Sequence, residues 1–512
     1  MTQLTSVVFP AKRQRPVWQY LIIPTAVFLL LLTYHPLRMG SVLLPYDKPT
    51  AKPPSATEHL KSERLHDYWT QLRDALATHR PAVPPVNVTG PPIPEEALDP
   101  NKVDSDSPRP SLVDMDEGDL ETLQALHFSF ITSLKTLAPS LPTWKGSRGV
   151  VMTAGGGYLG MAMTSILMLR RSGSVLPVHL FLDTLAERDP DLCDTVLPAL
   201  NVECLVMEDL LRGGHGAAAA EVEHFQYKVL AMLLSPFEQI LYLDSDAWPI
   251  RAPDRLFDSA PFTSHGLVAW PDFWLGTASP LYYRIAGLAP PRILARRSSE
   301  SGILLYDKAT HAESLLLAAY YNWYGPRWYY PLLSQGAHGE GDKETFVQAA
   351  LALGQPFWDV RTPVTVLGRW VNGTFETSGM KQADPAEDHG LFGAAAAAAP
   401  DADHAREEPD EGKRMRARPL FIHHNLFKVS LGAVGGPHDP MFRADADGRL
   451  ARLWGPDRGL VESSGFDVER AMWDVVLAAD CGSTSSGPDE CDRLKQWYRT
   501  VFIEAPPLIP ES

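Results

Sequence analysis

The stretch FQYKVLAMLLSPFEQILYLDSDAWPI, residues 225–250, decides the fold class of this chain. Its first half has the spacing of a helix, and the apolar run at 239–243 is typical of a buried strand. Asp244 and Asp246 follow that run directly. Because side chains two residues apart share one face of a strand, we expect both carboxylates to point the same way.

The segments before this stretch alternate between short apolar runs and longer helical patterns. In chain order they read GVVMTA (149–154), MAMTSILMLRRSG (161–173) and PVHLFL (177–182). Together with 225–250 they predict strand, helix, strand, helix, strand, which indicates an α/β domain with a largely parallel sheet. Ligands of such sheets bind at the carboxyl ends of the strands, where the two aspartates lie.

Composition and charge limit the functions open to the chain. Its 512 residues are 45% hydrophobic and 21% charged, so it can bury a large core. A formal net charge of -16 argues against binding nucleic acid, which needs clustered lysine and arginine. A single nucleotide phosphate bound through a metal ion remains compatible, because the cation supplies the positive charge.

The first 110 residues predict an anchor and a spacer. Residues 17–34 (VWQYLIIPTAVFLLLLTY) carry no charge and suffice for one membrane-spanning helix, with a cleaved signal peptide as the alternative. Basic residues before this segment make 1–16 a cytosolic tail and place everything after it on the luminal side. Residues 35–110 are rich in proline, which resists packing and predicts an extended stem with one short helix near 59–77.

Residues 111–512 are expected to form the catalytic domain. A helix is predicted at 119–137, a strand at 419–423 and one more helix at 468–479. Residues 376–418 contain an alanine run followed by a block of mixed charge, and we interpret them as a mostly disordered surface insertion.

Cysteines and glycosylation sequons agree with a luminal location. The cysteines fall in two close pairs, Cys193 with Cys204 and Cys481 with Cys491. These pairs are the natural disulfides in an oxidising compartment, although other connectivities and free buried thiols stay open. Asn87 and Asn372 each begin an Asn-x-Thr sequon and are the expected sites of N-glycosylation.

The aspartate pair has a metal-binding and a structural interpretation. Carboxylate oxygens suit hard cations such as Mg²⁺ or Mn²⁺, and open coordination positions let a diphosphate complete the shell. The alternative is that Asp244-Ser245-Asp246 is a turn that caps the next segment.

A glycine run strengthens the ligand-binding interpretation. Gly155, Gly156 and Gly157 follow the first predicted strand and precede a helix, where a ligand can approach the backbone. A plain tight turn is the alternative. Asp183, at the end of PVHLFLD, keeps a dinucleotide-dependent dehydrogenase formally open.

Three later segments also carry candidate residues. SESGILLYDK (299–308) is a Ser/Gly turn that leads into an apolar strand. In SQGAHGEGDKETF (334–346), Asp342 and Glu344 stand among glycines and could bind sugar hydroxyls, unless the loop is simply solvated. In FIHHNLFK, His423 and His424 follow a strand; neighbours point to opposite sides, so at most one of them reaches a given metal.

Taken together, these segments resemble the fungal Golgi α-mannosyltransferases that extend mannan and glycoprotein outer chains with α-1,2- or α-1,3-linked mannose. The resemblance covers about residues 144–428, without the insertion. It implies a type II Golgi membrane protein with a GT-A-like, Rossmann-type nucleotide-sugar transferase domain. It also implies GDP-mannose as donor, Mn²⁺ as cofactor and a mannose-containing glycan as acceptor, with retention of the α linkage. The protein would act alone or as part of a Golgi mannosyltransferase complex.

The resemblance also assigns roles to residues. The metal ligands would be Asp246, Asp244 and, of the two neighbouring histidines, His424, while Asp244 could instead contact the ribose. Asp342 and then Glu344 would be the catalytic carboxylates. The donor-binding residues would be Gly155, Gly156, Gly157, Lys228, Asp244, Ser301 and Gly302.

Acceptor contacts are expected from an aromatic stretch, because sugar C–H faces stack on aromatic rings. Its members are Tyr320, Tyr321, Trp323, Tyr324, Trp328 and Tyr329. The same aromatics could equally be core residues.

Other function classes stay open at this point. A transferase that uses another nucleotide sugar fits the same motifs, since nothing in the sequence reads the base. A phosphatase of the haloacid dehalogenase type also begins with a strand and an Asp-x-Asp motif, but near the start of its domain. A non-catalytic member that binds glycan or supports a complex is the third alternative.

Overall fold

The structure, a computed structural model, describes most of the chain. The described residues are 55–155, 157–211, 222, 225–337, 339, 341–398, 416–432, 434, 439–442, 444, 448–481, 488–506 and 508. The expected cytosolic tail and the anchor at 17–34 lie outside them, as does Gly156. None of the helices in these ranges is both long enough and apolar enough to span a bilayer.

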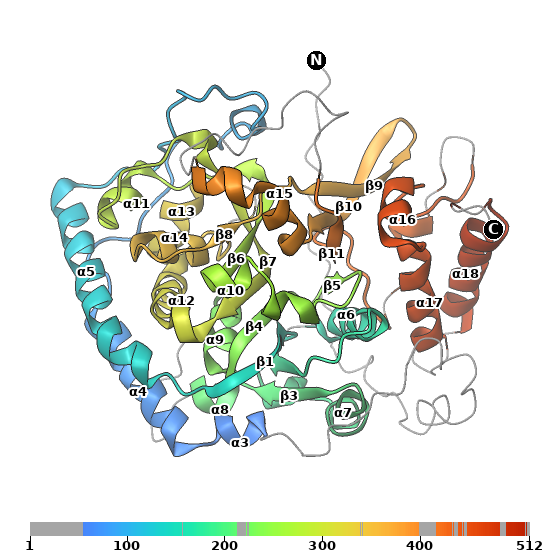
Figure 1. Cartoon of the computed structure of the whole chain (residues 1–512), viewed down its shortest axis with the longest axis horizontal. Coiled ribbons are helices and arrows are strands. Elements are labelled where there is room, and N and C mark those ends of the chain that lie inside the picture. The colour runs from blue at the N-terminus through green and yellow to red at the C-terminus, as the bar shows by residue number, and fades with distance from the viewer. Residues whose placement is uncertain are drawn as a thin grey trace.

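A seven-stranded sheet with the order β3-β2-β1-β4-β7-β6-β8 forms the centre of the molecule (Figure 1). Its parallel half consists of β3 (Val202–Val206), β2 (Val178–Leu182), β1 (Trp144–Thr153) and β4 (Phe237–Leu243). The other half contains β7 (Arg297–Asp307), β6 (Leu267–Leu275) and β8 (Trp358–Asp359). β7 runs antiparallel to both β4 and β6, so the sheet is mixed. The predicted α/β alternation is confirmed, and β3 is a strand that the sequence pattern did not reveal.

Two hydrophobic cores cover the two faces of this sheet. Along β4, Ile240 and Tyr242 enter one core while Leu241 and Leu243 enter the other, as the alternation of strand side chains requires. The first core is closed by α9 (Gln226–Leu234) and α12 (Lys308–Trp323), and the second by α6 (Leu159–Arg171). The sheet is therefore buried on both faces, which explains its continuous apolar strands.

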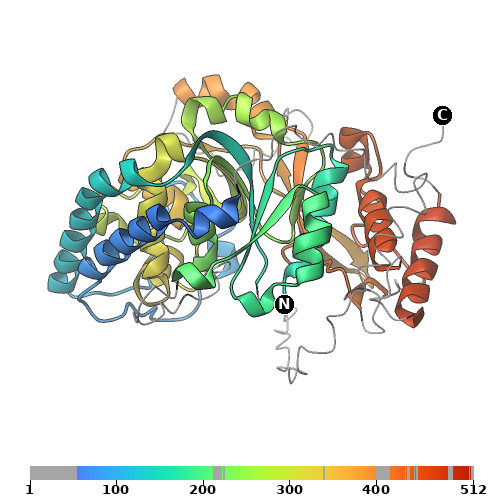
Figure 2. The ribbon, with the colours of Figure 1, turned by 90° about the horizontal axis from the view of Figure 1, so that it is seen from below.

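Residues 55–110 do not behave as an extended stem. They form α3 (Ala56–Leu60) and α4 (Glu63–Thr78), and α4 lies beside α5 (Glu117–Ser140) against the first core (Figures 1 and 2). Leu65, Trp69, Leu72 and Leu76 are buried there. The expectation that this composition resists packing is wrong for the described part, because these apolar side chains recur on one helical face.

A second, four-stranded antiparallel sheet has the order β5-β11-β10-β9. It is built from β5 (Ala247–Pro249), β9 (Thr365–Val371), β10 (Thr374–Ala383) and β11 (Pro419–His423). The predicted insertion at 376–418 therefore begins inside a sheet strand and continues in α15 (Pro385–Ala398). The carboxyl of Asp388 is buried and accepts hydrogen bonds from the backbone N–H groups of Arg361 and Thr362, so a mostly disordered insertion is wrong for 376–398.

The C-terminal part contains more helix than the one predicted. α16 (Arg458–Ser464), α17 (Val468–Asp480) and α18 (Pro488–Tyr498) lie together at the end of the molecule opposite α4 and α5 (Figure 2). The remaining α-helices are α7 (Leu197–Ala199), α8 (Glu208–Leu211), α10 (Phe262–His265), α11 (Pro280–Ile285), α13 (Tyr330–Ser334) and α14 (Thr345–Ala352).

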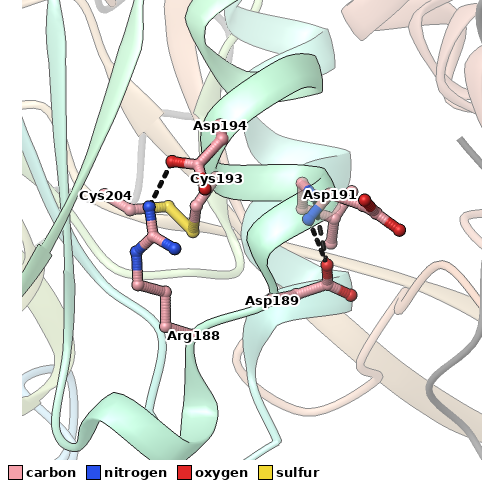
Figure 3. The surroundings of a disulfide bond; sticks show 7 residues. Arg188, Asp189, Asp191, Cys193, Asp194 and Cys204 are labelled. Atoms are coloured by element: carbon pink, nitrogen blue, oxygen red, sulfur yellow. Dashed lines mark hydrogen bonds and ion pairs between the residues drawn. A yellow bond between two sulfur atoms is a disulfide. The ribbon is translucent and has the colours of Figure 1, made fainter.

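Both expected cysteine pairs are bonded in the structure. The Cα atoms are 5.5 Å apart in each pair, Cys193 with Cys204 and Cys481 with Cys491. The first bond ties the turn before α7 to β3 (Figure 3). The second ties the end of α17 to α18.

Candidate active site

The carboxyl end of β4 carries the two aspartates of the sequence motif. Asp244 is fixed by its backbone N–H, which donates to the carbonyl of Gly302 on β7 over 2.8 Å. Helix α6 holds the turn between the aspartates, because the Ser165 hydroxyl donates to the Ser245 carbonyl over 2.7 Å. Strand β11 then brings His423 alongside, and its Nε2 lies 3.1 Å from Oδ1 of Asp246.

Asp244, Asp246 and His423 form a group that can hold a metal ion. One ligand atom of each lies within 4.8 Å of the other two. A Cβ added at Gly302 would lie 2.5 Å from Cε1 of His423 and 2.9 Å from Oδ2 of Asp244. The missing side chain thus leaves room beside these ligands, and two carboxylates with one imidazole are compatible with a divalent metal ion.

The structure corrects the choice of His424 to His423. Neighbouring residues of a strand point to opposite faces, and His424 turns away from the aspartates. Its ring lies 6.2 Å from that of Trp248 and 5.3 Å from that of Trp454, centroid to centroid. Burial lowers the pKa of His424 to about 3, and its ring nitrogens have no hydrogen-bond partner within the described part of the chain. His424 is therefore a neutral core residue.

Glu300, which the sequence did not single out, orients His423. Oε1 of Glu300 lies 3.2 Å from Nδ1 of His423 and accepts the backbone N–H of Gly302 over 2.5 Å. Burial alone would lower the pKa of His423, but the carboxylates of Glu300 and Asp246 raise it well above its ordinary value. A carboxylate behind a ligating histidine fixes the ring so that the other nitrogen faces the metal.

Lys428 supplies a cation to the same cluster and was also missed. Its ammonium group forms an ion pair with Oδ2 of Asp246, and its side chain is 41% exposed. Burial would raise the pKa of Asp246, but His423 and Lys428 hold it well below the usual range. Asp246 is therefore ionised near neutral pH, as a metal ligand must be.

Lys228 and Asp342 extend the cluster on the side of β7. Nζ of Lys228 lies 3.0 Å from Oδ2 of Asp342 and 3.4 Å from Oδ1 of Asp244. It also donates to the carbonyl of Ser301 over 2.8 Å and to its hydroxyl over 3.0 Å. Burial raises the pKa of Asp342 against the opposing charge of Lys228. Lys228 is therefore no surface lysine but is buried between carboxylates.

Glu344 has structural partners. It lies 3.2 Å from the guanidinium of Arg296 and accepts the Ser299 backbone N–H over 2.7 Å and the Ser298 hydroxyl over 2.9 Å. These contacts fix the start of β7, and a catalytic role for Glu344 stays a prediction. Asp342 and Glu344 are both buried, so the alternative of a solvated loop is wrong for them.

Gly155 and Gly157, the described members of the glycine run, lie in a turn after β1. A Cβ at Gly155 would come within 2.9 Å of Oε2 of Glu187, and Gly157 has a φ of +94°, which disfavours any other residue. The backbone N–H of Asp183 donates to the same Glu187 oxygen over 3.2 Å. Donor binding by these glycines stays a prediction.

The expected acceptor aromatics are core residues. Of that stretch, Tyr320, Tyr321, Tyr324, Trp328 and Tyr329 are buried. The Tyr320 hydroxyl donates to the His79 carbonyl over 2.9 Å, and the Tyr324 hydroxyl to the Leu76 carbonyl over 2.6 Å. They attach the N-terminal helices to the domain, which supports the alternative that these aromatics are core residues. Asn87 and Asn372 are exposed, and their glycosylation stays a prediction.

The fold and the cluster define an α/β protein with an Asp-Asp-His group at the end of a central strand. The family model described as "Mannosyltransferase putative" matches residues 147–295 and 292–384. α-1,2-Mannosyltransferase MNN21 of Candida albicans is 34% identical over 383 residues, covering 65% of this chain and 57% of the relative. MNN24 of the same organism is 41% identical over 273 residues, covering 47% and 38%.

A yeast relative and two solved structures complete the comparisons. α-1,2-Mannosyltransferase MNN2 of Saccharomyces cerevisiae is 34% identical over 319 residues, covering 55% of this chain and 52% of the relative. The glycosyltransferase GlyE of Streptococcus pneumoniae TIGR4 superposes with a TM-score of 0.31 at 13% identity, covering 64% of this chain and 62% of that one. The galactosyltransferase LgtC gives 0.28 at 12%, covering 41% and 73%.

Residues 147–384 of the chain are therefore similar to the MNN-type mannosyltransferases. The chain spans about half the length of the curated relatives it matches.

Proposed function

We propose that this chain is a metal-dependent glycosyltransferase of the GT-A type. It moves mannose from GDP-mannose to a mannose residue of a glycoprotein glycan or mannan. Its relatives are named α-1,2-mannosyltransferases, which favours an α-1,2 over an α-1,3 linkage. The proposal rests on the convergence of Asp244, Asp246 and His423 at the end of β4.

Asp244, Asp246 and His423 would hold Mn²⁺, whose charge, when bound, stabilises the diphosphate leaving group. The carboxylates of Glu300 and Asp246 flank the His423 ring, at Nδ1 and Nε2 respectively. Lys428 is partly exposed and can turn from Asp246 toward a donor phosphate. Lys228 is less available for that role, because two carboxylates and Ser301 already surround its ammonium group.

Asp342 is our candidate for the carboxylate that faces the donor sugar. It shares Lys228 with Asp244, which ties it to the metal cluster. A carboxylate in this position can stabilise positive charge on the departing mannosyl group or accept a hydrogen bond from a sugar hydroxyl. We propose that the α linkage is retained, and the anomeric signal of the product in an NMR time course tests this.

A transfer assay with matched variants tests the function. The purified protein is given GDP-mannose, α-mannobiose and Mn²⁺, and we expect mannotriose and GDP that disappear with a chelator. Asp246→Asn and His423→Ala should lower turnover about 100-fold or more. His424→Phe is the matched control, because it keeps the aromatic packing and should retain turnover. An Asp246→Asn variant with full turnover, or a wild-type protein that binds no GDP with Mn²⁺, would contradict the proposal.

We further propose that the protein is a single-pass type II Golgi membrane protein with a luminal catalytic domain. The uncharged segment 17–34, the two bonded cysteine pairs and the exposed sequons support this placement. Protease treatment of sealed Golgi vesicles tests it, since a luminal domain survives until detergent is added.

A further inference from the structure

The hairpin of β9 and β10 carries an exposed aromatic surface that the site described above does not use. It projects from the body between α15 and α16 (Figure 1). We define the hairpin ledge as Val366, Gly368, Trp370, Phe375 and Thr377, none of which is charged. Trp370 is 67% exposed, and its ring contacts that of Phe375 at 5.4 Å between centroids. A large exposed aromatic pair of this kind is typical of a binding surface.

The register of the sheet places this ledge on the same face as the metal ligand His423. His423 pairs with Met380 of β10, and Met380 pairs with Val366 of β9. Directly paired residues share a face, and so do alternate residues along one strand, so His423, Val366 and Trp370 point to one side. At about 3.3 Å per residue, Val366 and Trp370 are about 13 Å apart, which is longer than one hexose ring.

Local features keep the ledge uncharged. A Cβ at Gly368 would lie 2.9 Å from Cε1 of Phe375, so the phenyl ring lies close to this glycine. The charged pair of Arg369 and Glu376 is turned to the other face, where Nε of Arg369 lies 3.7 Å from Oε2 of Glu376. A neutral aromatic surface suits the C–H face of an uncharged sugar.

The ledge is also continuous with the loop that carries Lys428. The backbone N–H of Phe427 donates to the carbonyl of Ser378 over 2.9 Å. Ser378 is the extra residue where the register of β10 against β9 shifts, between Thr377 and Gly379. The metal site, this loop and the ledge therefore form one connected border of the second sheet.

We propose that the hairpin ledge is a subsite for an extended acceptor, binding hexose units several positions away from the sugar that receives the mannose. The inference rests on the proposed function and narrows it, because such a ledge favours a mannose oligosaccharide over a monosaccharide or a disaccharide. Trp370 is the main stacking ring, and Phe375 supports it.

Calorimetric titration of the full chain, with GDP and Mn²⁺ present, tests the subsite without relying on turnover. Mannohexaose is compared with mannobiose. Trp370→Ala should weaken binding of mannohexaose about fivefold to tenfold and leave mannobiose unchanged, while Trp370→Tyr should restore most of the loss. Phe128→Ala, which removes an exposed aromatic from α5, is the matched control and should change neither.

The outcomes separate this inference from the proposed function. A wild-type protein that binds GDP with Mn²⁺ but binds mannohexaose no more tightly than mannobiose contradicts the subsite. It does not contradict the proposed function. An equal loss of affinity for both sugars in Trp370→Ala also overturns the subsite. So does a change in the sedimentation of Trp370→Ala without a change in sugar affinity, because it would make the ledge a contact between copies of the chain. Failure to bind GDP with Mn²⁺ at all overturns the proposed function itself.

Discussion

Gly302 is the residue whose substitution should close the candidate metal site. The Cβ of Gly302→Ala would lie 2.5 Å from His423 and 2.9 Å from Asp244, so at least one ligand must move. We expect affinity for Mn²⁺ to fall about tenfold or more, in the range seen when the surroundings of metal ligands are disturbed. Calorimetric titration with Mn²⁺ in the presence of GDP measures this. Gly390→Ala on α15 is the control, since nothing lies within 4 Å of its added carbon; equal affinity in both variants would count against the site.

Lys428 should compete with the metal ion. Its ammonium group pairs with Oδ2 of Asp246, an oxygen that a bound cation would use. Lys428→Ala should therefore raise the affinity for Mn²⁺ in the absence of nucleotide by about threefold to tenfold, because no internal cation has to be displaced. Electron paramagnetic resonance of free Mn²⁺ gives the affinity directly. Lys381→Ala, which removes a lysine paired with Asp457, should leave it unchanged. Weaker binding in Lys428→Ala would mean that the lysine supports the ion instead of replacing it.

The sequence predicted the metal cluster only in part, for reasons specific to each residue. Asp244 and Asp246 are adjacent in a motif, so strand geometry alone places them together. Alternation showed that only one of His423 and His424 could join them, but which one depends on the face that β11 turns to the aspartates after β4. Glu300 and Lys428 reach the cluster through the pairing of β7 and through a loop, and a single sequence carries no signal for either.

At the scale of elements, helix α4 should be an essential part of the domain. Leu72 is buried in the first core, although it belongs to a segment whose composition suggested a free stem. Leu72→Ala should lower the free energy of unfolding by about 2–5 kcal/mol. Urea unfolding of the two proteins measures the difference. Gln71→Ala replaces an exposed neighbour on the same helix and should change the free energy of unfolding little. Equal stability of the two variants would indicate that α4 is only a loosely attached spacer.

Two predictions, the free stem and the disordered insertion, were wrong for the same reason. In both, amino-acid composition was given more weight than the spacing of apolar residues. α4 confirms the short helix predicted near 59–77, but the prolines of 35–110 suggested a free stem, so the burial of Leu65, Trp69, Leu72 and Leu76 on one face of that helix was not predicted. The alanines and charges after residue 390 concealed β10, which is a central strand of the second sheet. The alternating units from β1 to β4 were predicted because their periodicity is strong and local.

At the scale of the whole molecule, buried ionisable groups away from the active site should make stability depend on pH. Burial raises the pKa of Glu469 to about 8, against an ordinary value of 4.5. It accepts the backbone N–H groups of Leu453 and Trp454 over 2.7 and 3.2 Å. Burial lowers the pKa of Lys308 to about 7, against an ordinary value of 10.5. These two groups lie in different parts of the protein, and their contributions to stability should change in opposite directions as pH rises.

Between pH 4.5 and 8 the folded protein keeps the proton of Glu469, which the unfolded chain has released, so this residue's contribution to stability falls as pH rises. Glu469→Gln cannot ionise, so its stability relative to wild type should increase from pH 5.5 to 8, by about 1.4 kcal/mol for each pH unit. Urea unfolding at both pH values measures the change. A constant difference between the two proteins would show that Glu469 is already ionised in the folded state.

In the same experiment, the contribution of Lys308 to stability should change with pH in the opposite direction to that of Glu469. Between pH 7 and 10.5 the unfolded chain holds a proton that the folded protein lacks, so the contribution of Lys308 to stability rises with pH. Lys308→Met removes the cost of burying the charge, so its advantage over wild type should be greatest below pH 7 and shrink as pH is raised to 9. As pH rises, Glu469→Gln should gain stability relative to wild type and Lys308→Met should lose it. A general effect of pH on unfolding cannot produce both results. Two variants that respond in the same direction would contradict the assignment of these two buried charges.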